Sequence, residues 1–300
     1  MTLNDFHCHF FSSSFLRVLG QQAGLQGGED LAFIVAGKLE WDDPGSNLQL
    51  AGRWIEELDR EGVNRVGLIA SLPGDETSVA EAVNAFPERF VGQFMVDPGQ
   101  PNAVTTTRRG FEELGLRVVC LFPAMHHFRL DADEAMAILE IADDFGGAAF
   151  VHCGVLSVGV RKKLGLPSRF DVRLGNPLDL QRAAVSFPGL PIVIPHFGAG
   201  FFREALIVAS LHPGIYLDTS SSNSWVKYFP NLNMQAVFST AFEVLGSERL
   251  LFGTDSSFFP RGWQSSILKT QRAVLADLGV AKQEQEHLFS ANFERLFPAG

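Results

Sequence analysis

The chain of 300 residues is poor in cysteine, in charged residues and in long apolar runs. Its three cysteines are an odd number without C-x-x-C spacing, which argues against a disulfide framework. The formal net charge of −10 argues against nucleic acid as a partner, because phosphate binding needs a basic face. No apolar run approaches the roughly 20 residues of a membrane span, and the N-terminus lacks the basic and apolar segments of a signal peptide. We therefore expect a reduced, cytoplasmic protein without nucleic-acid or membrane partners.

Hydrophobic residues make up 46% of the chain, which is enough to fill a sizeable core. Short apolar runs alternate with longer stretches of helical period. Several runs are rich in valine and isoleucine almost throughout, as in strands that are buried on both faces. Eight runs predict strands, at residues 2–10, 63–71, 89–97, 116–123, 148–154, 191–198, 215–221 and 249–255.

The segments between these runs have the pattern of helices. The helical segments are 46–62, 76–86, 101–114, 131–147, 176–187, 201–211, 232–245 and 263–278. Eight strand–helix units in series predict an α/β protein with the (β/α)₈ barrel fold, in one domain spanning 1–300. The length exceeds the roughly 250 residues typical of that fold, and the surplus lies in an insertion at about 11–45 and a long loop at about 154–175.

Two histidines stand one residue apart in the first predicted strand, in the stretch "DFHCHF" at residues 5–10. Because successive side chains of a strand point to opposite faces, His7 and His9 share a face with Asp5. The other face carries Phe6, Cys8 and Phe10. An isolated H-x-H pattern is more simply explained by satisfied core histidines, so its meaning depends on whether the rest of the chain supplies partners.

Other strand ends supply such partners. His152, His196 and Asp255 lie near the ends of the predicted strands five, six and eight, and in this fold functional residues sit at the C-terminal ends of strands. Three histidines and one carboxylate are a typical ligand set for a divalent metal such as zinc, which activates water by lowering its pKa to about 7. One histidine would then remain free for acid–base chemistry.

These motifs make the chain resemble the amidohydrolase superfamily, and within it the amidohydrolase-related branch typified by aminocarboxymuconate-semialdehyde decarboxylase. The resemblance runs from about residue 4 to 297. It is carried by "DFHCHF" for the D-x-H-x-H motif, "FVHCG" on strand five, "PHFGAGF" for H-x-G-x-G, and "LLFGTDSSF" at strand eight.

The resemblance implies a role for each of these residues. His7, His9 and His152 would be metal ligands, Asp255 a ligand or proton shuttle, and His196 the catalytic acid or base. Asp5 would be an outer or structural residue that lies deeper on the same inward face.

Strand four lacks the lysine that bridges two metals in binuclear members of the superfamily. Cys120 lies near that place, either as a thiolate ligand or as a small buried hydrophobe, and whether it faces the site is open. We therefore predict one divalent metal, with zinc expected and manganese as the alternative.

Basic residues cluster after the fifth predicted strand and suggest an anionic substrate, with a solvated basic loop as the alternative. The cluster comprises Arg161, Lys162, Lys163, Arg169 and Arg173. Further candidates for binding substrate are Arg203, Arg261 and His126, or His127 beside it. Aromatic residues that could wall a planar substrate are Trp41, Trp263, Phe258 and Phe259, although core packing explains the phenylalanines equally well.

We predict a metal-dependent hydrolase that uses a metal-activated water on an amide, lactone or similar bond of a small, carboxylate-bearing substrate. The alternative within the same branch is a non-oxidative decarboxylase. A third hypothesis, a catalytically silent barrel that binds a metal or a partner, is disfavoured by the intact ligand set. A homodimer is left open.

Overall fold

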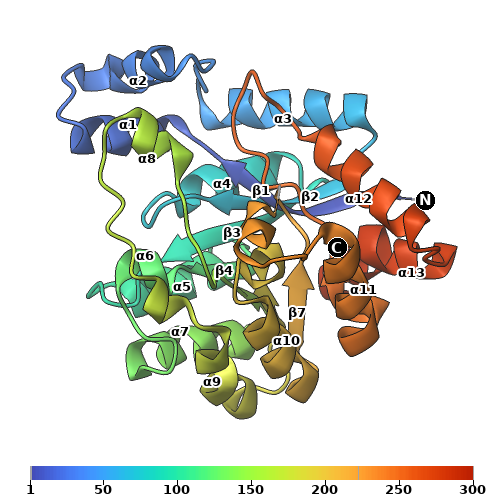
Figure 1. The fold of residues 1–300 in the computed structure, drawn as a ribbon. Helices are drawn as coiled ribbons and strands as arrows, with labels where there is room; N and C mark the ends of the chain where they lie inside the picture. The colour runs from blue at the N-terminus through green and yellow to red at the C-terminus, as the bar shows by residue number, and fades with distance from the viewer. Residues whose placement is uncertain (1, 222, 300) are drawn as a thin grey trace.

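The computed structural model describes residues 2–221 and 223–299 and contains eight parallel strands in sequential order around a barrel (Figure 1). The strands are β1 (Asn4–Phe10), β2 (Arg65–Ala70), β3 (Phe90–Val96), β4 (Val118–Leu121), β5 (Ala148–Val151), β6 (Ile192–Ile194), β7 (Ile215–Asp218) and β8 (Leu250–Leu251). The predicted (β/α)₈ barrel is therefore confirmed, with β8 shorter than the sequence suggested.

Backbone hydrogen bonds between the last strand region and the first bring the sheet close to full closure. Phe6 N donates to Phe252 O at 2.8 Å, and His9 N donates to Ser256 O at 2.7 Å. An isolated parallel bridge also pairs Cys8 with Ser256. The segment after β8 is thereby held alongside β1, which places the two strongest sequence motifs next to each other.

Helices cover the outside of the barrel between successive strands. The main ones are α3 (Asn47–Glu61), α4 (Glu76–Ala85), α5 (Ala103–Glu112), α7 (Asp133–Asp144), α9 (Gln181–Ser186), α10 (Phe202–Leu211), α11 (Met234–Leu245) and α12 (Ser265–Asp277). The helix α3 begins with a capping box of Ser46 and Gln49 and ends at Gly62 in the left-handed conformation. Among the described residues, no helix is long and apolar enough to cross a bilayer.

The strand β1 contains a bulge that changes which side chains face inward. Its pairing advances from Asp5 to Cys8 while the pairing on β2 advances only from Val66 to Leu68. One extra residue on β1 shifts the alternation of the side chains, as bulges do.

The bulge changes part of the prediction about which side chains of β1 point into the barrel. Phe6 packs inside the barrel with Phe150, whereas Asp5 is buried on the outer side beside Cys8. The prediction that Asp5 shares the inward face with His7, and that Phe6 faces away, is wrong. It assumed that side chains alternate strictly along the strand, and the extra residue of the bulge breaks that alternation.

Aromatic rings from the C-terminus close the N-terminal end of the barrel. The helix α14 (Asn292–Leu296) follows α13 (Lys282–Glu286), and the Phe297 ring after it stacks on Phe6 with centroids 5.7 Å apart. Arg65, at the start of β2, forms an ion pair of 2.7 Å with Glu294. The open end of the barrel is therefore the opposite one, where the strands end.

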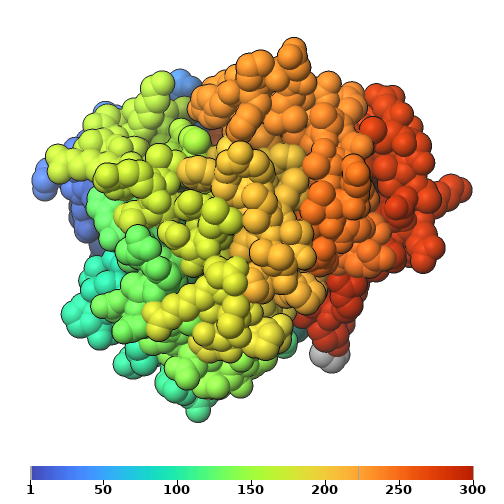
Figure 2. All heavy atoms as spheres, turned by 60° about the horizontal axis from the view of Figure 1, so that its bottom comes forward, coloured from blue at the N-terminus to red at the C-terminus, as the bar shows by residue number. Residues whose placement is uncertain are grey.

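The two insertions pack on each other beside that open end. The insertion after β1 forms α1 (Ser13–Gln22) and α2 (Leu31–Leu39), and the loop after β5 forms α8 (Gly159–Lys163). Val160 and Leu164 join the apolar cluster of α1 and α2, and the yellow-green segment after β5 lies against the blue N-terminal residues (Figures 1 and 2). The short α6 (Pro123–His126) follows β4.

Candidate active site

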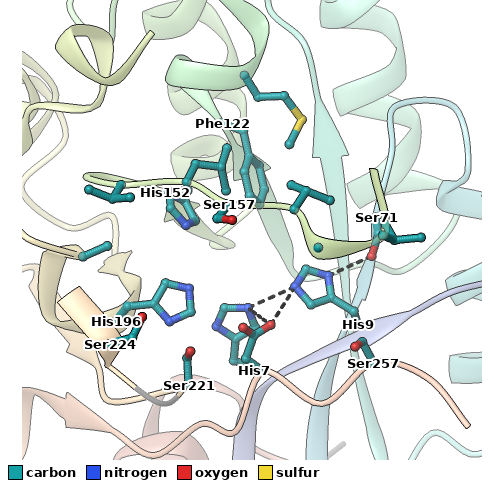
Figure 3. A pocket seen from close by; sticks show the side chains of 18 of the residues that line it. His7, His9, Ser71, Phe122, His152, Ser157, His196, Ser221, Ser224 and Ser257 are labelled. Carbon is teal, nitrogen blue, oxygen red and sulfur yellow. Dashed lines mark hydrogen bonds and ion pairs between the residues drawn. The ribbon is translucent and has the colours of Figure 1, made fainter. Parts of the chain in front are cut away.

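The five residues predicted at strand ends line one cavity at the open end of the barrel. His7 and His9 come from β1, His152 directly follows β5, His196 comes after Pro195 at the end of β6, and Asp255 lies in the segment after β8. The cavity has a volume of about 660 Å³. Figure 3 shows the four imidazoles arranged around a common space.

His7, His9 and Asp255 form a compact group suited to one cation. The Nε2 atoms of His7 and His9 lie 3.3 Å apart, and Asp255 Oδ1 lies 3.2 Å from His9 Nε2 and 3.8 Å from His7 Nε2. Ligand atoms about 2.0–2.1 Å from a tetrahedral zinc are roughly 3.4 Å from one another. The spacing of the three atoms therefore matches three ligands of one metal ion.

Hydrogen bonds to the other nitrogen of each ring leave both Nε2 atoms free. His7 Nδ1 lies 2.7 Å from Asp218 Oδ2, and an ionised carboxylate can only accept. Ser71 Oγ donates to Ile69 O at 3.1 Å, so it accepts from His9 Nδ1 at 2.8 Å. Each ring thus donates through Nδ1 and directs the lone pair of Nε2 into the site, as metal-bound histidines do.

His152 lies beside this group with a buried nitrogen that lacks a partner. Its ring stacks on Phe122 with centroids 5.3 Å apart and lies 5.3 Å from the His196 ring. Within the described chain His152 Nδ1 is buried without a hydrogen bond, a costly state for a polar atom. The structure places His152 at the cavity but outside the group of donor atoms within 4.8 Å of one another, which comprises His7, His9 and Asp255.

His196 follows β6 in a left-handed conformation, with φ of 55°. Its Nδ1 lies 3.2 Å from Ser220 O and 2.9 Å from Ser220 Oγ. Because the carbonyl can only accept, Nδ1 carries the proton and Nε2 of the neutral ring keeps an unshared pair. His196 therefore lines the cavity with one nitrogen anchored and the other free to exchange a proton.

Burial and neighbouring charges both shift the pKa values of these groups. Burial lowers the pKa of His7, but the Asp218 carboxylate outweighs burial and raises it. Burial lowers the pKa of His196, and a charge on His7 lowers it further. Burial raises the pKa of Asp255, but the neighbouring His9 ring and the charge of His7 hold it well below its usual range. Asp255 is therefore ionised at neutral pH, the state in which a carboxylate can bind a cation.

The predicted substrate-binding residues divide into those that line the cavity and those that do not. Arg261 lines it, where Ser257 Oγ at 2.7 Å and Asp255 O at 3.2 Å accept from its Nη2. Arg161 instead donates to Gln22 at 2.7 Å and points into the insertion. Two further residues lie outside the residues that line the cavity: the exposed Arg203, which pairs with its neighbour, and His126.

Charge is unevenly distributed around the cavity. Lys163, Lys227 and Arg261 line it, and Asp255 is the one carboxylate among the described lining residues. The remaining basic residues predicted in the β5 loop lie outside the lining: Lys162, Arg169 and Arg173. Three cations around one acid, in a chain of net charge −10, make the cavity attractive to anions.

Stacked rings form one wall of the cavity. Trp41 stacks on Phe258 with centroids 4.1 Å apart and on Phe11 with centroids 5.7 Å apart, and Arg261 lies over the Phe258 ring at 4.5 Å. Trp263 and Phe259 were also candidates for this wall, but they lie outside the lining. The wall is therefore built by the insertion after β1 and the loop after β8.

A family model described as Amidohydrolase matches residues 5–299, almost the whole chain. This chain belongs to the amidohydrolase family. A curated relative, the protein fluG of Emericella nidulans, is 32% identical over 95 residues, which are 30% of this chain. That match spans about 10% of fluG, so the relative has a far longer chain.

Solved structures with the same fold include both lyases and hydrolases. The 5-carboxyvanillate decarboxylase of Novosphingobium aromaticivorans, complexed with manganese and 4-hydroxy-3-methoxy-5-nitrobenzoic acid, is 15% identical with a TM-score of 0.64. It covers 99% of this chain and 96% of that one. A probable 2-pyrone-4,6-dicarboxylic acid hydrolase of Acinetobacter baumannii, with citric acid bound, is 15% identical, has a TM-score of 0.63 and covers 99% of both chains. At these identities the likeness establishes the fold.

Three residues that complete this amidohydrolase site were missed in the sequence. Asp218 and Ser220 hold His7, and Ser71 holds His9. Asp218 is the last residue of β7 and Ser71 follows β2, so the rule that polar residues at strand ends are functional applied to them as well.

Asp5 and Cys120 lie behind the site. Asp5 accepts from His7 N at 2.9 Å, from Thr254 N at 3.1 Å and from Trp263 Nε1 at 2.7 Å, and burial raises its pKa to about 6. Cys120 points into the barrel interior and donates to Gln93 Oε1 at 3.7 Å, but it lies outside the residues that line the cavity. Asp5 thus ties β1 to the segment after β8, and Cys120 packs beneath the cavity.

Proposed function

We propose that this amidohydrolase-family enzyme is a metal-dependent hydrolase acting on an amide, lactone or similar bond of a small, carboxylate-bearing substrate. The observation that carries the proposal is the convergence of His7 Nε2, His9 Nε2 and Asp255 Oδ1 within 3.8 Å of one another. His152, with its unpartnered Nδ1, is the fourth ligand that we assign.

We propose one metal ion per chain, zinc in the first place and manganese as the alternative. Imidazole and carboxylate suit both ions. The strand β4, with sequence Val-Val-Cys-Leu, offers neither a lysine nor a carboxylate for a second metal, and Cys120 lies beneath the cavity. A divalent metal supplies Lewis-acid chemistry, activating a water nucleophile and polarising a carbonyl oxygen.

His196 is the group that we assign to proton transfer. Its Nδ1–H is anchored on Ser220, so its Nε2 in the cavity is free to accept the proton of the nucleophile and to return it to the leaving group. Asp255 stays ionised beside it and stabilises the imidazolium that forms. A neutral histidine that begins as an acceptor is what hydrolysis needs, which favours this reaction.

Arg261 is the residue that we assign to the substrate carboxylate. Ser257 and the Phe258 ring hold its guanidinium at the cavity wall, so it is oriented before substrate binds. A planar guanidinium matches a carboxylate through two parallel hydrogen bonds. Lys163 and Lys227 add positive charge at the same cavity.

The second candidate reaction is non-oxidative decarboxylation in the same site. The observation that favours it is the combination of the Trp41–Phe258 stack with Arg261, because such a wall suits an aromatic acid. Decarboxylation would need His196 to enter the reaction as an imidazolium, whose Nε2–H could protonate the carbon that CO₂ leaves.

One experiment separates the two reactions. A panel of lactones, amides and aromatic carboxylic acids is screened with the metal-loaded enzyme, and the compound that turns over is then run in ¹⁸O-labelled water under a CO₂ monitor. Hydrolysis predicts label in a new carboxyl group and no CO₂. Stoichiometric CO₂ without retained label would overturn the hydrolase proposal in favour of the decarboxylase.

A further inference from the structure

One hydroxyl group connects the two histidines to which different tasks are assigned. Ser220 Oγ lies 2.9 Å from His7 Nδ1 and 2.9 Å from His196 Nδ1. A hydroxyl oxygen has two acceptor lone pairs, so it can receive an N–H from each ring at the same time. Each N–H has a second acceptor as well, Asp218 for His7 and the Ser220 carbonyl for His196.

The backbone around Ser220 is fixed, so its hydroxyl has a defined position. Ser220 N donates to Asp218 Oδ1, and Asn223 Nδ2 donates to Ser220 O at 3.2 Å. The preceding Thr219 exchanges two hydrogen bonds with Gln271 of α12, at 2.8 and 2.7 Å. All these side chains are buried, which protects the hydrogen bonds from exchange with water.

The segment after β8 leaves room for this contact because it has a glycine at this point. A Cβ placed on Gly253 would lie 2.9 Å from the Cβ atoms of both Ser220 and His7, and 2.9 Å from Asp218 Oδ1. Distances this short do not occur between ordinary side chains. The glycine of the "FGTD" stretch is therefore what allows Ser220 to approach the His7 ring.

We propose that Ser220 is a positioning residue that sets the relative orientation of His7 and His196, and so the distance between the metal and the proton-transfer group. The proposal rests on the proposed function, in which His7 is a ligand and His196 moves protons. Ser220 contacts neither metal nor substrate in this scheme. It acts by holding the rings of His7 and His196, whose centroids lie 5.1 Å apart.

The substitution Ser220→Ala isolates this role, because both rings keep their other hydrogen-bond acceptor. His7 still has Asp218 and His196 still has the backbone carbonyl, so we expect the variant to fold and to bind metal. Each ring gains freedom to rotate, and outer partners of metal-bound histidines typically contribute about 10–100-fold to metal affinity or activity. We expect about a 10-fold effect, since one of two partners remains for each ring.

Ser247→Ala is a matched control. Ser247 is buried and its Oγ lies 2.8 Å from His287 Nδ1, which is the same chemical pair far from the cavity. Ser220→Ala loses two serine–histidine hydrogen bonds and Ser247→Ala loses one, so the thermal stability of the control reports the general cost of losing one such bond. A change seen in Ser220→Ala but not in Ser247→Ala belongs to the site.

The test uses three measurements on Zn²⁺-loaded wild type and both variants. The first is the rate of Zn²⁺ transfer to a chelator, which we expect to rise about 10-fold in Ser220→Ala. The second is the spectrum of hydrogen-bonded Nδ1–H groups in protein labelled with ¹⁵N-histidine, where the His7 and His196 signals should shift and the His287 signal should stay. The third is turnover, in which kcat should fall about 10-fold while KM changes less than about twofold.

The outcomes separate this inference from the proposed function. Unchanged His7 and His196 signals with unchanged Zn²⁺ transfer, or equal effects in Ser247→Ala, would overturn the role of Ser220. Failure of the wild type to bind either Zn²⁺ or Mn²⁺ would instead contradict the proposed function, and the histidine spectra would still decide whether Ser220 orients the two rings.

Discussion

The Nε2 atoms of His7 and His9 lie 3.3 Å apart, and hydrogen bonding at both Nδ1 atoms leaves an unshared electron pair on each. Two acceptors at this distance repel each other unless a cation lies between or beside them. Asp255 adds a third donor atom with negative charge, 3.2 Å from His9 Nε2. Three such atoms so close together repel one another unless a cation binds them, which is why we base the proposed chemistry on this group.

Removal of the His196 ring separates proton transfer from metal binding. His196→Ala should keep the metal and lower kcat by roughly 10²–10⁴-fold, the range for loss of a general acid or base. Elemental analysis and steady-state kinetics on the same preparation check both parts. A folded variant without metal would mean that His196 is a ligand.

Asp218→Asn tests the carboxylate behind His7. Asp218 is fully buried and holds the ring in the tautomer that frees Nε2. We expect metal affinity to fall by about 10–100-fold, measured by competition with a chelator of known affinity. An affinity equal to that of the wild type would show that Asp218 contributes only to packing.

Arg261→Lys tests the carboxylate site in the cavity wall. Lysine keeps the charge but loses the planar pair of donors, so KM for an acidic substrate should rise about 10-fold, which corresponds to roughly 1.4 kcal/mol. Arg203→Lys is the matched control, since Arg203 is exposed and outside the cavity lining, and its KM should not change. Equal KM values in wild type and Arg261→Lys would refute the assigned role.

From the buried Asp75 carboxyl we predict a pH dependence of protein stability that does not involve the candidate active site. Burial raises the pKa of this carboxyl from 3.8 to about 6, although Ser12 Oγ donates to it at 2.7 Å. The folded state therefore binds this proton more tightly than the unfolded state does. The resulting contribution of Asp75 to the free energy of unfolding is fully present below pH 3.8 and is lost as the pH rises through 6.

Asp75→Asn removes this titration and keeps an acceptor for Ser12. At pH 7 the variant should be more stable than the wild type by about 1–3 kcal/mol, and the difference should shrink toward pH 4. Urea unfolding at several pH values in the presence of a chelator measures it. A difference that does not vary with pH would show that Asp75 titrates normally.

The sequence predicted the barrel and the ring of site residues because both follow from simple periodicities. Strands buried on both faces are nearly continuous apolar runs, so polar residues at their ends stand out, as His152 in "FVHCG" and Asp255 in "FGTD" do. Parallel strands in a barrel end on the same side, so these residues had to meet at one cavity.

What could not be predicted depends on local irregularity and on side-chain direction. One extra residue in β1 reversed the facing of Asp5 and Phe6, and nothing in the composition of "DFHCHF" marks a bulge. The destination of a long side chain on a loop is set by its tertiary neighbours: Arg161 reaches Gln22 in the insertion, whereas Arg261 is drawn to Ser257 at the cavity.

The metal content of the wild type and of His9→Ala tests most directly the central claim that His7 and His9 bind one metal ion. Wild-type protein purified without chelator should contain one equivalent of zinc or manganese, and His9→Ala should lose most of it because one strong ligand is missing. His212→Ala, which removes a histidine outside the cavity that pairs with Gln181, should keep the full equivalent. Two tightly bound equivalents in the wild type, or full metal content in His9→Ala, would contradict the account.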